Sequence, residues 1–262
     1  MILLLACATT DEIPGDATCD AAQDFRMYPA HAANSDYDDP YVEAACDGDE
    51  LRVRSNDIPH FEFAQLTPNA LEAQDDEWTI PLEPELAGTL TEIPLLGLAA
   101  FTLTGLHIYG PNEGDFPDPF GDPIYNDIVD ACLGHTAAAY HAHGLVTTCI
   151  VEEAPADGSE ADPLIGYALD GFPIYGRYGC ADADCTDIVE YQSGWEQTGD
   201  PTTYAWDNHE YVASDDAEVL DECNGHVGPG GDYHYHETAG FPYILGCYAG
   251  TPSDEAGQEG GP

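Results

Sequence analysis

Two copies of one short cassette, rich in histidine and closed by cysteine, place the strongest constraint on how this chain can fold. The first copy, residues 132–149, reads C-x-G-H, a spacer, Y-H-A-H and a closing cysteine. The second copy, residues 223–247, reads C-x-G-H, a spacer, Y-H-Y-H and a closing cysteine. Six of the ten histidines fall at matching places, so the chain carries an internal repeat rather than a coincidence.

The H-x-H pair that each cassette contains suits a metal ion. In a strand, residues i and i+2 point to the same face about 6–7 Å apart, so two imidazoles can converge on one ion. Neutral imidazole suits copper, zinc, iron or nickel, and exported proteins meet copper and zinc most often. Spacing alone does not decide between two separate sites and one shared centre. The predicted metal ligands are His135, His141, His143, His226, His234 and His236.

The same residues permit a second interpretation. Alternating tyrosine and histidine could form a hydrogen-bonded polar core, and the protein would then be a non-catalytic binding or structural module. His60 and His107 are candidates for further ligands, and Asp170 is a candidate partner that orients a ligand histidine. The tyrosines expected beside the ligands are Tyr140, Tyr233 and Tyr235.

The cysteines indicate export. Leu4–Cys7 resembles a bacterial lipobox, although the apolar run before it is short and has no basic residue. If Cys7 is lipidated, an even set of eight remains, which favours disulfides. No segment approaches the roughly 18 apolar residues that span a bilayer, so we expect a lipid anchor as the only membrane contact. The eight are Cys19, Cys46, Cys132, Cys149, Cys180, Cys185, Cys223 and Cys247.

The charge is strongly acidic. There are 51 acidic residues against 4 basic ones, and the formal net charge is -47. Such a chain repels phosphate backbones, which excludes ordinary nucleic-acid binding. Calcium binding is possible, and Asn112–Asp122 alternates oxygen donors, but that segment lacks the spacing of a known calcium loop. We favour a solvated acidic loop and adaptation to a salty, halophilic exterior, because the carboxylates are spread along the chain.

The organisation of the chain predicts an all-β fold: a single β-rich, sandwich-like domain with long loops, disulfide links and few short helices. We expect a partial signal over 1–7, a flexible tether over 8–27, the domain over 28–250 and a disordered tail over 251–262. Alternating apolar runs punctuated by glycine and proline predict strands within 79–82, 95–109, 139–150, 164–178, 203–206 and 233–248. Short helices are expected around 69–74 and 215–220.

At this point the sequence resembles the YHYH-domain family, named for the motif present here as Tyr233–His236. The segments that carry the resemblance cover about residues 50–250 and are Ser55–His60, Gly166–Gly176, Leu220–His226 and Phe241–Cys247. Two departures stand out: Asp57 occupies a position where glycine is usual, and Ala142 replaces the second tyrosine in the first cassette. The resemblance implies an exported protein and names no reaction.

Taken together, the sequence predicts an exported, lipid-anchored protein that binds copper or zinc through two histidine triads. Whether it is an enzyme stays open, as does any small-molecule or surface partner. A three-histidine site would leave a position for water or oxygen, allowing metal-assisted hydrolysis or copper redox chemistry. The disulfide pairing we favour is Cys132 with Cys149, Cys223 with Cys247, Cys180 with Cys185, and Cys19 with Cys46.

Overall fold

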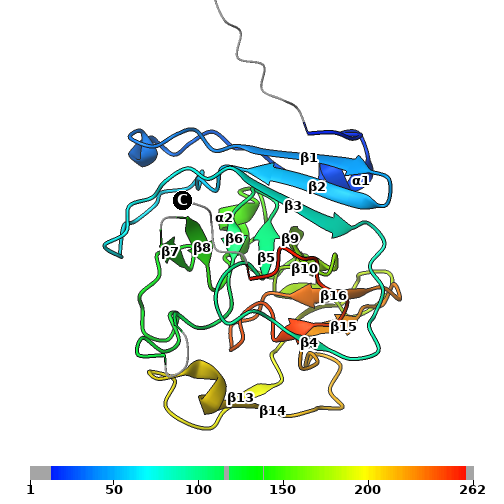
Figure 1. Cartoon of the computed structure of the whole chain (residues 1–262). Helices are drawn as coiled ribbons and strands as arrows, with labels where there is room; N and C mark the ends of the chain where they lie inside the picture. Colours follow the sequence, from blue (N-terminus) through cyan, green and yellow to red (C-terminus); the bar gives the residue numbers. More distant parts are fainter. Residues whose placement is uncertain (1–12, 115–117, 138, 258–262) are drawn as a thin grey trace, which may run out of the picture.

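An eight-stranded sheet forms the centre of the protein. The computed structural model describes residues 13–114, 118–137 and 139–257. Within them the sheet has the order β15-β16-β10-β9-β5-β6-β8-β7, so the two hairpins that carry the histidine cassettes lie at its opposite edges (Figure 1). Its strands are β5 (Ala100–Thr102), β6 (His107–Ile108), β7 (Gly134–Thr136), β8 (Tyr140–Ala142), β9 (Leu164–Ala168), β10 (Pro173–Tyr175), β15 (Gly225–Val227) and β16 (Tyr233–His236).

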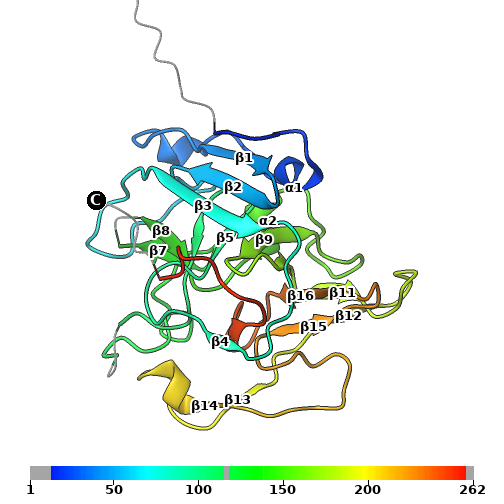
Figure 2. The ribbon, with the colours of Figure 1, turned by 45° about the vertical axis from the view of Figure 1, so that its right-hand side comes forward.

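A second, three-stranded sheet lies against the first. It consists of β1 (Val42–Asp47), β2 (Glu50–Ser55) and β3 (Asp76–Pro81), and Figures 1 and 2 show it across the top of the molecule. Trp78 of this sheet stacks on Phe101 of the large sheet with ring centroids 4.7 Å apart, and both side chains are almost fully buried. Two layers that share one apolar core confirm the predicted all-β, sandwich-like architecture.

The rest of the described secondary structure consists of two-stranded ladders and short helical turns outside the two sheets. The remaining strands are β4 (Thr91–Glu92), β11 (Tyr178–Cys180), β12 (Ile188–Glu190), β13 (Trp195–Gln197), β14 (His209–Tyr211) and β17 (Cys247–Tyr248). The helical turns are α1 (Asp20–Gln23), η1 (Ala32–Asn34), α2 (Thr147–Ile150) and η2 (Ala205–Asn208). Among the described residues, no helix has the length and apolar character needed to cross a membrane.

The large sheet consists of two copies of one four-strand unit. In each copy the inner strand pairs antiparallel with the next strand, which pairs parallel with the histidine hairpin. The two inner strands, β5 and β9, meet in a register that is symmetric about the Phe101–Tyr167 pair, as a two-fold axis requires. The sequence carries the same repeat: residues 98–110 and 164–176 share L-x(4)-L-x-G-x-x-I-Y-G. The internal repeat therefore extends well beyond the cassettes.

Several local expectations differ from the structure. The segment 139–150 begins as strand β8 but ends as helix α2, and 203–206 runs into the turn η2 rather than a strand. The helices expected over 69–74 and 215–220 do not form. The first segment uses its backbone for contacts with distant parts of the chain, since the Gln74 N–H donates to the Asn56 carbonyl. The second is held as a turn because the Asp216 side chain accepts the Glu218 N–H.

The ends of the domain reach further than expected. Residues 13–27 are not a free tether: they contain α1, and Asp16 bridges to Cys46 through backbone hydrogen bonds. In the expected tail, the Ser253 N–H donates to Leu169 and the Gly257 N–H donates to Leu98. The lipobox with Cys7, together with residues 258–262, lies outside the described residues.

All four favoured disulfides are present. They link Cys19 to Cys46, Cys132 to Cys149, Cys180 to Cys185 and Cys223 to Cys247. Four disulfides in one domain are typical of proteins that fold in an oxidising compartment outside the cytoplasm.

Candidate metal centres

Each cassette folds into a β-hairpin that gathers its three histidines. In the first hairpin His135 of β7 lies opposite His141 of β8, and in the second His226 of β15 lies opposite His234 of β16. The third histidine of each set follows two residues later on the same side of the hairpin: His143 comes directly after β8, and His236 ends β16. The two hairpins pair their histidines in the same register, although the spacer before the H-x-H pair is longer in the second. The three histidines therefore have the same arrangement in both hairpins.

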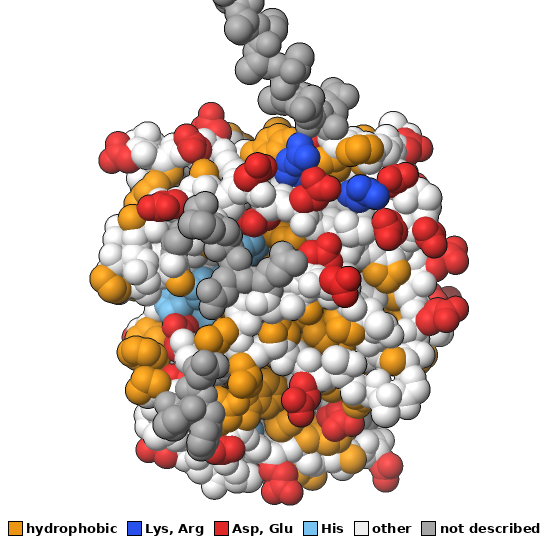
Figure 3. All heavy atoms as spheres, in the orientation of Figure 1, with side chains coloured by type: hydrophobic (Ala, Val, Ile, Leu, Met, Phe, Trp, Pro, Cys, Tyr) orange, Lys and Arg blue, Asp and Glu red, His pale blue; other side chains and the backbone are white. Residues whose placement is uncertain are grey.

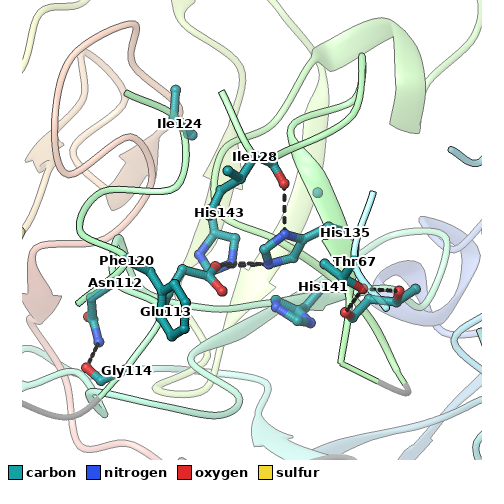
Figure 4. A network of polar contacts seen from close by, with 12 residues as sticks. Thr67, Asn112, Glu113, Gly114, Phe120, Ile124, Ile128, His135, His141 and His143 are labelled. Atoms are coloured by element: carbon teal, nitrogen blue, oxygen red, sulfur yellow. Dashed lines mark hydrogen bonds and ion pairs between the residues drawn. The ribbon is translucent and has the colours of Figure 1, made fainter. Parts of the chain in front are cut away.

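In the first cluster, three imidazoles and one carboxylate converge (Figure 4). The Nε2 atoms of His135 and His143 are 3.2 Å apart, and Glu113 Oε1 lies 2.8 Å from the first and 2.7 Å from the second. The ring centroid of His141 lies 4.8 Å from that of His135 and 5.0 Å from that of His143. All three imidazoles are buried, and Glu113 is 17% exposed. The cluster is therefore closed to solvent on most sides.

The second cluster consists of three imidazoles. His226 Nε2 lies 3.1 Å from His234 Nε2 and 3.3 Å from His236 Nε2. His236 is buried, whereas the other two are partly exposed. The ligand atoms of each cluster lie within 4.8 Å of one another. The structure thus brings together all six predicted histidines, in two separate groups at opposite edges of one sheet.

Backbone carbonyls fix the direction of the imidazoles. His143 Nδ1 is 2.7 Å from the Gly110 carbonyl, and at the equivalent place His236 Nδ1 is 2.6 Å from the Gly176 carbonyl. The Nδ1 atom of His135 is likewise 2.9 Å from the Ile128 carbonyl. A neutral imidazole that donates from Nδ1 presents a lone pair at Nε2, so the carbonyls select the tautomer that can ligate a metal.

Burial keeps several of these imidazoles neutral. Desolvation lowers the pKa of His226 to about 4 and that of His236 to about 3, and it lowers the pKa of His141 well below its usual range. Glu113 behaves oppositely to most buried acids: burial raises its pKa, but hydrogen bonds from His135 and His143 bring it below the usual range. Burial opposes protonation of His135, but the hydrogen bond to Glu113 and the charge of that carboxylate together outweigh burial and raise the pKa of this imidazole. Imidazoles with a carboxylate form a typical cation-binding donor set, in which a metal ion would replace the shared protons.

An aspartate that sequence reasoning missed builds each hairpin. Asp130 Oδ1 accepts the N–H groups of Cys132 and Gly134 and the hydroxyl of Tyr140, the last at 3.0 Å. In the second hairpin Asp221 accepts the equivalent three groups, with the Tyr233 hydroxyl at 2.9 Å. The repeat is therefore D-x-C-x-G-H, and comparing the two cassettes two residues further upstream would have revealed it.

The residues between cysteine and histidine have defined backbone roles. Leu133 and Asn224 occupy equivalent places and both have positive φ, 65° and 68°. The glycine that follows each must lack a side chain, because a Cβ on Gly134 or Gly225 would collide with the tyrosine hydroxyl across the hairpin. These constraints explain C-x-G-H as a turn that delivers the first histidine of each triad.

Glu113 was also missed as a single ligand candidate. It belongs to the acidic segment Asn112–Asp122, which the sequence suggested as a solvated loop or a calcium site. In the described part of this segment, Asp118 accepts the N–H groups of Glu113, Gly114, Phe120 and Gly121. Asp122 likewise accepts backbone N–H groups and the Tyr243 hydroxyl. These carboxylates serve the loop itself, which positions Glu113 toward the histidines and gives calcium no support.

The other predicted residues lie outside the two groups. His60 stacks on Tyr28 at 4.7 Å, away from either cluster. His107 pairs with His141 across strands, but its Nε2 contacts Asp76 at 2.9 Å instead.

Asp170 does not orient a ligand imidazole. Its carboxylate accepts the Tyr235 hydroxyl at 2.6 Å and the Gly250 N–H at 2.9 Å. Because neighbouring side chains in a strand point to opposite faces, Tyr235 faces away from His234 and His236. Asp170 therefore anchors strand β16, and the three predicted tyrosines support the hairpins from the face opposite the imidazoles.

The fold and the clusters define a class: an all-β, disulfide-linked protein with twin histidine centres on one sheet. The family model described as YHYH protein matches residues 77–250, and the chain belongs to that family. No curated protein matches the chain significantly, and no solved structure does so either.

Proposed function

We propose that this chain is an exported, lipid-anchored protein that binds two transition-metal ions, copper or zinc, one in each histidine cluster. The observation that carries the proposal is the convergence of Nε2 atoms at 3.1 to 3.3 Å in clusters where five of the six imidazoles have Nδ1 facing a backbone carbonyl. Two nitrogens bound tetrahedrally to one ion at roughly 2.0–2.1 Å are about 3.3 Å apart. The spacing in both clusters fits that geometry.

The alternative, a hydrogen-bonded polar core, accounts for the two clusters unequally. In the first, Glu113 can accept protons from two imidazoles, so a network without metal is satisfied. In the second, no carboxylate joins the group among the described residues. The Nδ1 atoms of His234 and His236 face carbonyls, so the Nε2 lone pairs of both rings point at His226 Nε2, which carries at most one hydrogen when neutral. At least one lone pair is therefore left without a donor, and a bound cation would satisfy it, which favours the metal interpretation.

The donor atoms narrow the choice of metal. The eight described cysteines form disulfides, so no thiolate is available there. Calcium prefers six to eight oxygen ligands, and neither cluster gathers more than one carboxylate from the described part of the chain. Imidazole with at most one carboxylate suits zinc and copper(II).

The test is the number of ions bound by the full chain after treatment with a chelator. We expect two Zn²⁺ or Cu²⁺ ions by calorimetry and elemental analysis, and one ion for either His143→Ala or His236→Ala. His31→Ala, at an exposed imidazole, serves as the matched control and should retain two. Wild-type protein that binds neither metal would contradict the proposal and favour the polar core.

The anchor and the setting rest on separate features. Cys7 would carry the lipid, and Cys7→Ser is expected to release the protein from the membrane fraction of expressing cells. The acidic side chains are scattered over the face shown in Figure 3, which supports solubility in a salty exterior rather than one cation-binding patch. If the Cys7→Ser variant stays in the membrane fraction, the lipid anchor is contradicted, whereas the proposal of two metal sites is untouched.

A further inference from the structure

The two clusters differ at one equivalent position. Residues 108–110 and 174–176 both read I-Y-G. Three residues after the glycine of this motif, the first copy has Glu113 and the second has Gly179. The carbonyls of Gly110 and Gly176 accept hydrogen bonds from Nδ1 of the equivalent His143 and His236. The second cluster thus has a glycine where the first has its carboxylate ligand.

No side chain from that position reaches the second cluster. A Cβ on Gly179 would lie 3.0 Å from His236 Cε1 and 2.6 Å from Tyr191 Cε2. The Tyr191 ring packs 4.4 Å from both His226 and His236. An aromatic face, which cannot donate a lone pair to the ion as a carboxylate does, therefore covers part of this side.

A cavity opens beside the second cluster. Its volume is about 310 Å³, and its walls include His234, His236, Gly179 and the rings of Tyr175 and Tyr191. The turn Gly228–Gly230 of the second hairpin forms another wall. This turn is longer than its counterpart in the first hairpin by two residues, and it contributes only glycine and proline there. The longer spacer and the missing carboxylate leave the partly exposed His234 facing this cavity, with the buried His236 in its wall.

We propose that the ion in the second cluster, unlike the ion in the first, keeps one coordination position open to this cavity. We further propose that a small, uncharged, ring-sized molecule with a nitrogen or oxygen donor occupies that position. This inference rests on the proposed function, since it requires a metal ion in each cluster. Three histidines with an open position form the usual arrangement of a reactive metal site, whereas four protein ligands form a structural one.

Charge and shape select this class of ligand. Asp162, Asp182 and Asp232 line the cavity, and its described walls include no lysine or arginine, so anions are repelled. A protonated amine is attracted but has no lone pair to give the ion. A neutral donor escapes both limits, and the tyrosine rings offer flat faces for stacking. The volume lies at the lower end of the range for ligand pockets, which suits a single ring.

Pyridine is a suitable probe, because it is neutral at pH 8 and carries one nitrogen donor. The full chain is loaded with Cu²⁺ at both clusters and titrated with pyridine while electron paramagnetic resonance follows nitrogen coordination. We expect one of the two copper signals to change. The change should persist in His143→Ala and disappear in His236→Ala, with azide binding at least about tenfold more weakly than pyridine.

Reciprocal variants provide the matched comparison. Glu113→Gly should open the first cluster, so that both copper signals respond to pyridine. Gly179→Glu should close the second and weaken pyridine binding about tenfold or more. Because Gly179→Glu must displace the Tyr191 ring, Glu113→Gly keeps the test decisive if that variant fails to fold.

The outcomes separate the two proposals. Copper in both clusters with equal pyridine responses, or with none, would overturn the open position while leaving the metal function intact. A stronger response to azide than to pyridine would overturn the ligand class. Failure to load copper at all would remove the proposed function, and the open position with it.

Discussion

The two halves of the large sheet share a frame and differ in what closes it. Both place three imidazoles on a hairpin. In both, the third imidazole faces the glycine carbonyl of an I-Y-G segment, and an aspartate accepts hydrogen bonds from the turn. Among the residues that the structure describes, only the first half adds a carboxylate, Glu113. The comparison teaches that the repeated backbone sets the triad, whereas one side chain from a neighbouring loop sets how accessible it is.

The largest expected effect tests whether the shared frame carries equal weight in both halves. Asp130→Ala and Asp221→Ala each remove the acceptor for two backbone N–H groups and one tyrosine hydroxyl. Each should lower the free energy of unfolding by about 3 kcal/mol, measured by urea denaturation. Asp184→Ala, at an exposed site, is the control and should change little. A loss in only one half would break the equivalence of the two hairpins.

The next prediction separates the two clusters. Glu113→Gln removes the charge from the fourth ligand of the first cluster and should weaken zinc binding there by about 10- to 100-fold. Affinity at the second cluster should stay unchanged, as competition with a fluorescent chelator can show. Glu92→Gln, at an exposed glutamate, controls for the loss of one surface charge. Equal weakening at both clusters would mean that Glu113 acts through overall charge and not as a ligand.

A pH effect is expected from the first half. Burial raises the pKa of Asp57 from 3.8 to about 7, and this residue accepts the His107 N–H. The second half has Pro173 at the place of His107, which leaves no equivalent pair. Since the folded state holds a proton that the unfolded state has released, the stability contributed by this group falls as pH rises from about 4 to about 7.

Asp57→Asn keeps the hydrogen-bonding oxygen and removes this titration. The difference in unfolding free energy between pH 5 and pH 7 should become less negative, by on the order of 2 kcal/mol, in urea titrations at both pH values. Asparagine also tolerates the positive φ of 53° at this position. An unchanged pH dependence would show that Asp57 is already ionised in the folded protein at pH 5.

The smallest effect is expected at His60. Its ring packs on Tyr28 and belongs to neither cluster. His60→Asn should therefore leave both zinc affinities within about twofold of wild type, even if the domain becomes less stable. A tenfold loss of affinity in either cluster would return His60 to the list of ligands.

Much of the site could be predicted because its signals are local. The H-x-H spacing, the matched C-x-G-H turns and the even cysteine count each depend on residues close in sequence. The structure brings the six histidines into two groups that could hold a metal ion, and it contains all four favoured disulfides. The all-β class was predicted from short apolar runs separated by glycine and proline, a pattern typical of strands joined by turns.

Other features depend on distant contacts that no single-sequence pattern reveals. Glu113 reaches His135 and His143, which lie 22 and 30 positions later in the sequence, only because β6 pairs with β8. Helix formation over 69–74 was wrong because backbone groups there bond to other segments. Asp170 was misassigned for a related reason: spacing cannot tell which face of β16 an aspartate from another strand will meet.

The order of the disulfides bears on how the chain acquires its covalent links. Each of the eight described cysteines bonds to the next one along the chain, from Cys19 with Cys46 to Cys223 with Cys247. A polypeptide that enters an oxidising space from its N-terminus therefore meets every correct partner before any wrong one of the later pairs has emerged. If the chain is exported in this direction, oxidative pairing of each unpaired cysteine with the next to emerge would give the native set without reshuffling.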